Sequence, residues 1–135
     1  MEYISKNEKD TINIAKEFAK TLSVGDVVTL EGDLGAGKTV FTKGIVDFFS
    51  GGKQIAISPT FTIVNEYQTN PKLYHFDFYR INSPKELFAI GVEEYLYGDG
   101  ICIVEWPERA PEVFDGMNIK KVVIEKNGEN RKICF

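Results

Sequence analysis

The sequence predicts an α/β fold, with parallel strands at the centre of its sheet and an antiparallel hairpin near the C-terminus. Segments of β-branched and apolar residues alternate with segments of helical periodicity, which is the pattern of βαβ units. The predicted strands at the centre are apolar along their length, as strands covered on both faces are. A chain of 135 residues has room for one core, so we expect residues 1–135 to form a single domain.

Composition restricts the class of protein. Hydrophobic residues make up 43% of the chain and charged residues 27%, a balance typical of a folded domain. The N-terminal residues are polar and no apolar run is long enough to span a bilayer, so we expect a cytoplasmic protein that does not enter a membrane. The net charge of -4 disfavours strong direct binding to RNA. Cys102 and Cys134 lack the spacing of a metal site and are expected to be free thiols.

The N-terminal half contains a helix, a strand and a second helix. Asp10 or Thr11 can cap the first helix. Its apolar residues recur every three or four positions: Ile12, Ala15, Ala19 and Leu22. Residues 27–31 are β-branched and apolar, which is typical of a central buried strand. A second helix is expected at 39–49, and a pair of glycines ends it.

The second half contains the remaining strands and two short helices. The expected strands lie at 61–67, 73–76, 101–104, 122–125 and 131–134. The last two flank a four-residue turn at 127–130 and form the hairpin. Ser83 followed by proline begins one short helix, and residues 92–96 continue as another.

Residues 32–39 read GDLGAGKT and match the phosphate-binding pattern G-x-x-x-x-G-K-[ST] between a predicted strand and a predicted helix. The glycines permit backbone conformations in which successive N–H groups point at phosphate oxygens. Lys38 adds a positive charge for the β- and γ-phosphates, and the Thr39 hydroxyl can coordinate the Mg²⁺ that bridges them. The sequence therefore predicts a three-layer sandwich of the P-loop NTPase type.

Such a site needs a carboxylate at the end of a buried strand, to hold the metal and to orient the attacking water. Glu105 follows four apolar residues, whereas Asp77 follows a strand that contains His75. We favour Glu105 as the metal ligand and Asp77 as the second carboxylate, and the division of roles between them stays open. Either residue can also be an ordinary cap or turn residue.

Thr60 and His75 each have a functional and an ordinary structural interpretation. Thr60 lies in the segment SPTF between the second helix and the next strand, where nucleotide switches keep a threonine that senses Mg²⁺ and γ-phosphate. The same threonine can simply begin a strand after a proline. His75 has no cluster of titratable residues near it in sequence, so we expect a core histidine or one that supports a metal ligand.

The missing motifs favour ATP hydrolysis over other nucleotide chemistry. Neither guanine-recognition pattern, N-K-x-D or D-x-x-G, occurs, so ATP is favoured over GTP. A small-molecule kinase usually needs an arginine-rich lid, and this chain has only Arg80, Arg109 and Arg131. We therefore favour ATP hydrolysis coupled to a partner protein. The alternatives are a small-molecule kinase and a regulatory module that binds nucleotide without hydrolysing it.

Five segments resemble one known family. GDLGAGKT, SPTFTIVNEY, YHFDFYRI, GVEEYL and IVEWPE, in this order and across most of the chain, resemble the bacterial TsaE (YjeE) family. The resemblance implies the ATPase subunit in synthesis of the threonylcarbamoyl group on adenosine 37 of tRNAs that read codons beginning with A. It also implies ATP and Mg²⁺ as cofactors, and the TsaB-TsaD complex as the partner through which tRNA is reached indirectly.

The resemblance also assigns roles to residues in the matching motifs. It implies Lys38 and Thr39 as phosphate and metal residues, Glu105 as the metal carboxylate, Asp77 as a catalytic carboxylate and Thr60 as part of a switch-like loop. Trp106 falls in the same signature, and Thr11 and Arg131 lie in segments that resemble the adenine-side wall. The expected ATP-binding residues are Asp33, Leu34, Gly35, Ala36, Gly37, Lys38, Thr39, Val40, Thr60, Thr11 and Arg131. The expected catalytic residues are Lys38, Asp77 and Glu105, and the expected metal ligands are Thr39 and Glu105.

Overall fold

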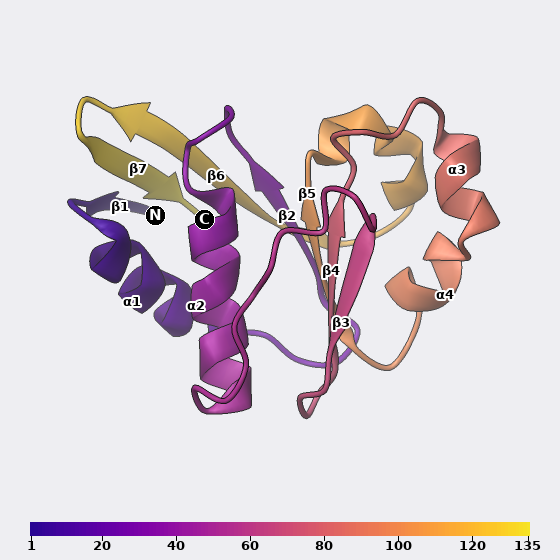
Figure 1. Cartoon of the computed structure of the whole chain (residues 1–135), viewed down its shortest axis with the longest axis horizontal. Helices are drawn as coiled ribbons and strands as arrows, with labels where there is room; N and C mark the ends of the chain where they lie inside the picture. The colour runs from indigo at the N-terminus through magenta and orange to yellow at the C-terminus, as the bar shows by residue number, and fades with distance from the viewer.

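The fold is built on one mixed β-sheet, in which the first strand of the chain pairs with the last. The structure, a computed structural model, describes residues 1–135. Seven strands follow one another across the sheet in the order β1-β7-β6-β2-β5-β4-β3 (Figure 1). Their bounds are β1 Glu2–Ser5, β2 Val27–Glu31, β3 Val64–Tyr67, β4 Leu73–Asp77, β5 Ile101–Glu105, β6 Ile119–Asn127 and β7 Asn130–Cys134. Strands β6, β2, β5 and β4 are parallel, whereas β1, β7 and β3 form antiparallel pairs at the two edges.

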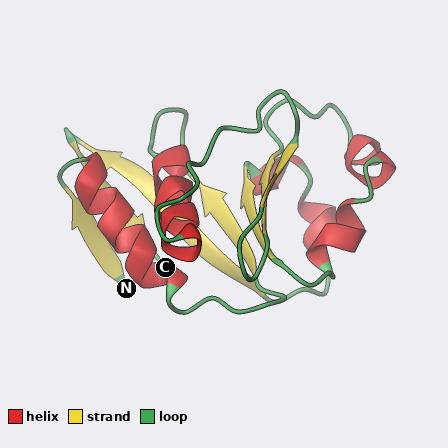
Figure 2. Cartoon of the chain, turned by 60° about the horizontal axis from the view of Figure 1, so that its bottom comes forward, coloured by secondary structure: helices red, strands yellow, loops and turns green.

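Helices cover both faces of this sheet. Helix α1 (Glu8–Ala19) and helix α2 (Lys38–Ser50) lie side by side over one face, as Figure 2 shows. The other face packs against α3 (Pro84–Ala89), α4 (Val92–Leu96) and two 3₁₀ helices, η1 (Pro107–Arg109) and η2 (Pro111–Phe114). None of the helices is long and apolar enough to cross a membrane. The three layers and the parallel centre confirm the predicted α/β fold.

The alternation of side chains along the central strands divides the core in two. Residues i and i+2 of a strand point to the same face of the sheet. In β5, Ile101 and Ile103 join the core beneath α1 and α2, whereas Cys102 and Val104 join the core on the other face. Both faces of β5 are therefore buried, and each such aliphatic side chain contributes about 1.5–3 kcal/mol to folding.

The same alternation decides which polar side chains of β4 and β5 lie together. Leu73 of β4 belongs to the core beneath α2, so His75 and Asp77 point to that face as well. In β5, Glu105 shares this face with Ile103. Asp77 and Glu105 are register partners at the carboxyl ends of the two parallel strands. Two carboxylates are therefore fixed side by side at the carboxyl ends of β4 and β5.

The N-terminal segment differs from the prediction in two respects. A short strand, β1, precedes the first helix and pairs with β7, which the sequence analysis did not expect. The predicted caps Asp10 and Thr11 are wrong, because the side chain of Asn7 accepts a hydrogen bond from the Asp10 backbone N–H at 2.8 Å. Asn7 is as good a cap as Asp10, and it begins the helix one turn earlier. Helix α1 ends at Ala19, so Leu22 is buried beyond its end rather than within it.

Two other predicted boundaries were wrong. The strand expected at 61–67 begins only at Val64, because the Pro59 carbonyl accepts hydrogen bonds from the backbone N–H groups of Thr62 and Ile63 and turns the chain. The strand expected at 122–125 is longer, Ile119–Asn127, because Asn127 still pairs with Asn130 in the β6–β7 ladder. This pair closes the predicted four-residue turn at 127–130, and Gly128, one of its two central residues, supplies the positive φ that the tight turn requires.

The contact between α1 and α2 supplies a test of the packing. A Cβ atom at Gly44 would lie 2.5 Å from the Ala15 Cβ and 2.7 Å from the Ile12 carbonyl oxygen. We expect Gly44→Ala to lower the free energy of unfolding by about 1–3 kcal/mol, because overpacking outweighs the better helix propensity of alanine. Chemical denaturation measures the change. The control is Lys43→Ala, a half-exposed position of the same helix, and a Gly44→Ala protein as stable as this control would contradict the packing described.

Candidate functional site

A glycine-rich loop joins β2 to α2 and leaves the first turn of the helix without a side-chain cap. Gly35 and Gly37 have φ values of 76° and 110°, which residues with a Cβ rarely adopt. Gly37 immediately precedes the helix and provides no capping side chain. Uncapped N–H groups at a helix N-terminus form a site for anions, because they carry the positive end of the helix dipole. The loop therefore has a geometry suited to phosphate.

Lys38 is the first residue of α2, and its ammonium group lies inside the site. Nζ donates a hydrogen bond to the Gly32 carbonyl oxygen and lies 3.5 Å from the centre of the Trp106 ring. Only 5% of the Lys38 surface is exposed. Burial lowers the pKa of this ammonium group, and neighbouring carboxylates, first that of Glu105, act in the opposite direction. The loop thus holds a buried positive charge on neutral partners, a carbonyl oxygen and an aromatic face.

The Glu105 carboxylate is buried between α2 and β4. One of its oxygens, Oε2, lies 2.5 Å from His75 Nε2. The Thr39 hydroxyl donates to the other oxygen, Oε1, over a longer distance of 3.5 Å. Only 3% of the Glu105 surface is exposed, so the carboxylate depends on these two partners. The hydroxyl and the carboxylate oxygen face each other across the entrance to the phosphate loop.

Asp77, the last residue of β4, links the end of this strand to the segment that contains Thr60. The Thr60 hydroxyl donates a hydrogen bond of 3.0 Å to Asp77 Oδ2. The other oxygen, Oδ1, accepts a hydrogen bond of 2.8 Å from the Tyr79 backbone N–H. The Ser58 and Thr60 hydroxyl oxygens are 2.7 Å apart, within hydrogen-bond distance. The loop before β3 is therefore tied to a carboxylate that lies next to Glu105 in the strand register.

These side chains line one cavity of about 330 Å³. Its walls come from the phosphate loop, the segment at 58–60 and the carboxyl ends of β4 and β5. The lining residues are Leu34, Gly35, Gly37, Lys38, Thr39, Val40, Ser58, Thr60, Asp77, Glu105 and Trp106. The cavity brings together all three predicted catalytic residues and both predicted metal ligands.

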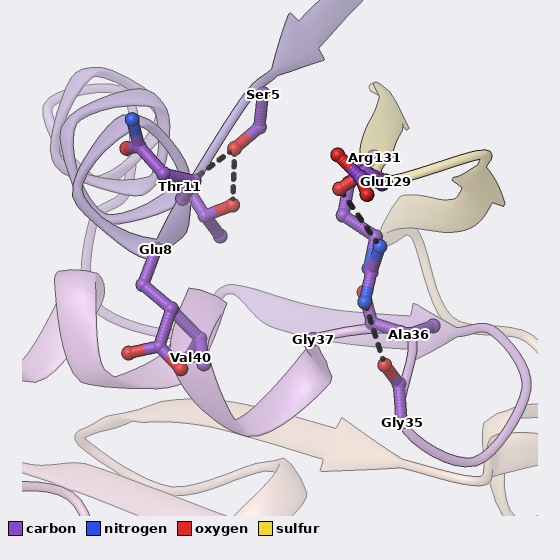
Figure 3. Close-up of a pocket in the computed structure, with 10 residues that line it drawn as sticks. Ser5, Glu8, Thr11, Gly35, Ala36, Gly37, Val40, Glu129 and Arg131 are labelled. Atoms are coloured by element: carbon purple, nitrogen blue, oxygen red, sulfur yellow. Dashed lines mark hydrogen bonds between the residues drawn. The ribbon is translucent and has the colours of Figure 1, made fainter.

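A second cavity, of about 240 Å³, lies on the other side of the same loop. Figure 3 shows Ser5 and Thr11 on one side of it and Arg131 on the other. The Ser5 and Thr11 hydroxyls are 2.6 Å apart. Arg131 donates from Nε to the Ala36 carbonyl oxygen at 2.9 Å and from Nη2 to the Gly35 carbonyl oxygen at 3.3 Å. Two residues distant in sequence, Thr11 and Arg131, therefore face each other over the phosphate loop.

The donor atoms in the first cavity suit a magnesium ion that is bound together with phosphate. No group of three or more His, Cys, Asp or Glu side chains is arranged to hold a metal ion. The Asp77 carboxylate also lines the cavity, but both of its oxygens already accept hydrogen bonds, whereas the Thr39 hydroxyl and the Glu105 carboxylate face each other and are both hard oxygen ligands. Mg²⁺ typically takes one or two protein ligands and completes its shell with waters and substrate phosphates. Thr39 and Glu105 are the side chains that could hold it.

The structure also shows which site residues the sequence analysis missed. Asp33, which the sequence analysis included, is exposed and lines neither cavity. Ser5, Asn7, Glu8 and Glu129 line the second cavity and were not expected there. No local pattern marks them, because they come together only where β1 pairs with β7. His75, for which the sequence predicts a core position or one that supports a metal ligand, is fully buried and contacts Glu105.

Comparison with known proteins agrees with this geometry. The model of one protein family, described as "Threonylcarbamoyl adenosine biosynthesis protein TsaE", matches residues 5–133. The tRNA threonylcarbamoyladenosine biosynthesis protein TsaE of Bacillus subtilis is 42% identical over 130 residues, which are 96% of this chain and 80% of that protein. The TsaE protein of Rickettsia prowazekii is 47% identical over 130 residues, which are 95% of this chain and 88% of that protein.

A solved structure shares the fold of this chain. The crystal structure of Bacillus subtilis YdiB superposes with a TM-score of 0.80 at 38% sequence identity. The superposition covers 98% of this chain and 82% of YdiB. The family match, the curated relatives and this shared fold together extend over nearly the whole chain. The chain belongs to the TsaE family of threonylcarbamoyl adenosine biosynthesis proteins.

Proposed function

We propose that this chain binds and hydrolyses ATP with Mg²⁺ and acts on the TsaB-TsaD complex in forming the threonylcarbamoyl group on adenosine 37 of tRNAs that read codons beginning with A. One observation carries the proposal. Lys38, Thr39 and Glu105 line a single cavity at the carboxyl ends of the parallel strands β4 and β5, with Asp77 and Thr60 beside them. Membership in the TsaE family supports the pathway.

In this proposal one nucleotide extends through both cavities. Both are lined by Gly35, Gly37 and Val40, so a ligand can extend from one to the other across the loop. The triphosphate occupies the cavity with Lys38, and the nucleoside lies on the side of Thr11 and Arg131. Arg131 bonds to two loop carbonyls and so holds the loop amides toward the phosphates. Lys38 leaves the Gly32 carbonyl and the Trp106 ring to contact the β- and γ-phosphates.

Hydrolysis depends on the carboxylates at the strand edge. Thr39 and Glu105 would hold a magnesium ion, which would neutralise charge on the β- and γ-phosphates. Asp77 orients the attacking water through a carboxylate whose direction is fixed by the hydrogen bond from the Tyr79 backbone N–H. Thr60 exchanges its bond to Asp77 for contacts to the bound nucleotide, which couples the loop before β3 to the occupancy of the site.

Partner proteins are needed for fast turnover because no arginine lines the cavity that contains Lys38. Arg131 is the arginine nearest to the loop, and its guanidinium is bound to loop carbonyls on the opposite side. An arginine that reaches the transferred phosphate contributes about 10³–10⁵ in rate in comparable enzymes. The chain alone therefore turns over slowly, and the TsaB-TsaD complex raises its rate. A kinase or a purely regulatory nucleotide-binding module would show no such dependence on partners.

Two substitutions separate binding from hydrolysis. Lys38→Ala should weaken ATP binding about 10- to 100-fold, because it removes a charge-assisted contact of about 1.5–3 kcal/mol. Glu105→Gln should keep the affinity for ATP without Mg²⁺ within about three-fold while lowering hydrolysis at least about 100-fold, the usual cost of losing one electrostatic group of a site. Calorimetry gives the affinities, and phosphate release gives the rates with and without TsaB and TsaD. Exposed Lys53→Ala is the control.

Two outcomes of these measurements would contradict the proposal. One is a Lys38→Ala protein with wild-type turnover, which would remove the phosphate loop from the chemistry. The other is an equal rate of hydrolysis in the wild-type protein with and without the TsaB-TsaD complex. A Glu105→Gln protein that supports repeated rounds of tRNA modification would favour the nucleotide-binding module instead.

The pH dependence of ATP affinity tests the environment of Lys38. Burial lowers the pKa of Lys38, so the ammonium form is present below this pKa and is lost as the pH rises through it. Since bound phosphate favours the ammonium form, affinity should fall above that pKa, by about ten-fold per pH unit at most. We expect the fall to begin at a lower pH than for an exposed lysine. Lys38→Ala should show no such fall, and a shared pH profile would contradict the assignment.

A further inference from the structure

His75 is the only histidine of the chain and is completely buried. It lies in β4 two residues before Asp77, on the face of the sheet that carries the site, with Leu73 on its other side in the core beneath α2. A residue in this position needs only an apolar side chain if its role is to fill the core. The polar contact that His75 makes instead therefore requires an explanation.

The two ring nitrogens of His75 have different surroundings. Nε2 lies 2.5 Å from Glu105 Oε2, whereas Nδ1 is buried without any hydrogen-bond partner. If the proton of the neutral ring were on Nδ1, the Nε2 lone pair would face a carboxylate oxygen and a buried donor would be left unpaired. The neutral tautomer that fits is the one with its proton on Nε2. His75 is thus a hydrogen-bond donor to Glu105.

This bond determines how the Glu105 carboxylate is presented. With Oε2 engaged by His75, the free oxygen Oε1 is the one that faces the Thr39 hydroxyl at 3.5 Å. The Thr39 contact is too long to fix the carboxylate by itself. The parallel pairing of β4 with β5 holds the ring and the carboxylate on neighbouring strands, so the contact is already formed in the isolated chain.

We propose that His75 is a positioning residue, which binds one oxygen of Glu105 so that the other is turned toward Thr39 for the magnesium ion of the nucleotide. This inference rests on the proposed function, because it assigns a role to His75 only if Glu105 contributes to metal-dependent nucleotide binding. His75 itself touches neither the nucleotide nor the metal. Its contribution is to remove the rotational freedom of a side chain that must meet the ion in one orientation.

A matched pair of substitutions tests the proposal. In His75→Gln the amide nitrogen reaches about as far as Nε2 and can still donate to Glu105, whereas the shorter His75→Asn cannot. The readout is the metal-linked gain in affinity, which is the affinity for a non-hydrolysable ATP analogue with Mg²⁺ divided by the affinity with EDTA. We expect His75→Asn to lower this gain about 10- to 100-fold and His75→Gln to keep it within about three-fold. Metal-free affinity should be equal in all three proteins.

A spectroscopic measurement on the unmodified protein complements the variants. Because the chain has one histidine, the ¹⁵N resonances of the ring are assigned without ambiguity. We expect a protonated Nε2 and an unprotonated Nδ1. A proton on Nδ1 with none on Nε2 would overturn the proposal, even if both variants failed to fold. An equal loss of metal-linked gain in His75→Gln and His75→Asn would also overturn it.

Glu105→Gln separates this proposal from the proposed function. If Glu105→Gln keeps the full metal-linked gain, Glu105 does not serve the metal, and the proposed function fails at that point. If Glu105→Gln loses the gain while His75→Asn keeps it, the proposed function stands and only the role of His75 is wrong. Loss in Glu105→Gln and His75→Asn, together with retention in His75→Gln, supports both.

Discussion

The parallel pairing of β4 with β5 is the constraint on which the rest of the site depends. Its register sets Asp77 opposite Glu105, and the two-residue period of each strand turns both side chains to the face of α2. His75 reaches Glu105 for the same reason, since it shares a face with Asp77 and lies one pleat nearer the core. A shift of one residue in this pairing would send one of the two carboxylates to the other face, away from the phosphate loop.

The cores on either side of the sheet explain how this register is maintained. Ile101 and Ile103 are buried beneath α1 and α2, and Cys102 and Val104 are buried beneath the helices of the other face. A slip of one residue would move each set to the opposite face, away from its helical partners. Charged groups can therefore be placed at the strand ends, where the apolar run stops, without loss of the packing that fixes them. The burial of Lys38 and Glu105 is tolerated because each has a defined partner within the site.

Sequence reasoning recovered the parts of this site that depend on local pattern. The phosphate loop, Lys38 and Thr39 follow from one contiguous motif, and Glu105 and Asp77 follow from the ends of apolar strands. The features that it missed depend on pairing between distant segments. The cavity beside Thr11 forms because β1 pairs with β7, and the four residues of β1 are too few to show a period. The cap at Asn7 was missed because Asp10 and Thr11, in the same polar stretch, are competing caps of similar quality.

The main polar side chains of the site are bound to partners within the chain. The ammonium of Lys38 is bound to a loop carbonyl and an indole ring, Asp77 is bound to Thr60, and Glu105 is bound to His75. Under the proposed function, a bound triphosphate replaces two of these contacts, those of Lys38 and Thr60, and the contact of His75 with Glu105 is kept. The proposal thus has binding change the loop before β3 and the phosphate loop together, around a fixed carboxylate.

The central claim is that one nucleotide spans both cavities, with its metal between Thr39 and Glu105. A crystal structure with Mg²⁺ and a non-hydrolysable ATP analogue tests it most directly. We expect the triphosphate to lie against the backbone amides of residues 33–39 and the base to lie beside Thr11 and Arg131. The metal should contact the Thr39 hydroxyl and the Glu105 carboxylate, either directly or through a water molecule. A triphosphate bound elsewhere, or a metal remote from both Thr39 and Glu105, would contradict this account.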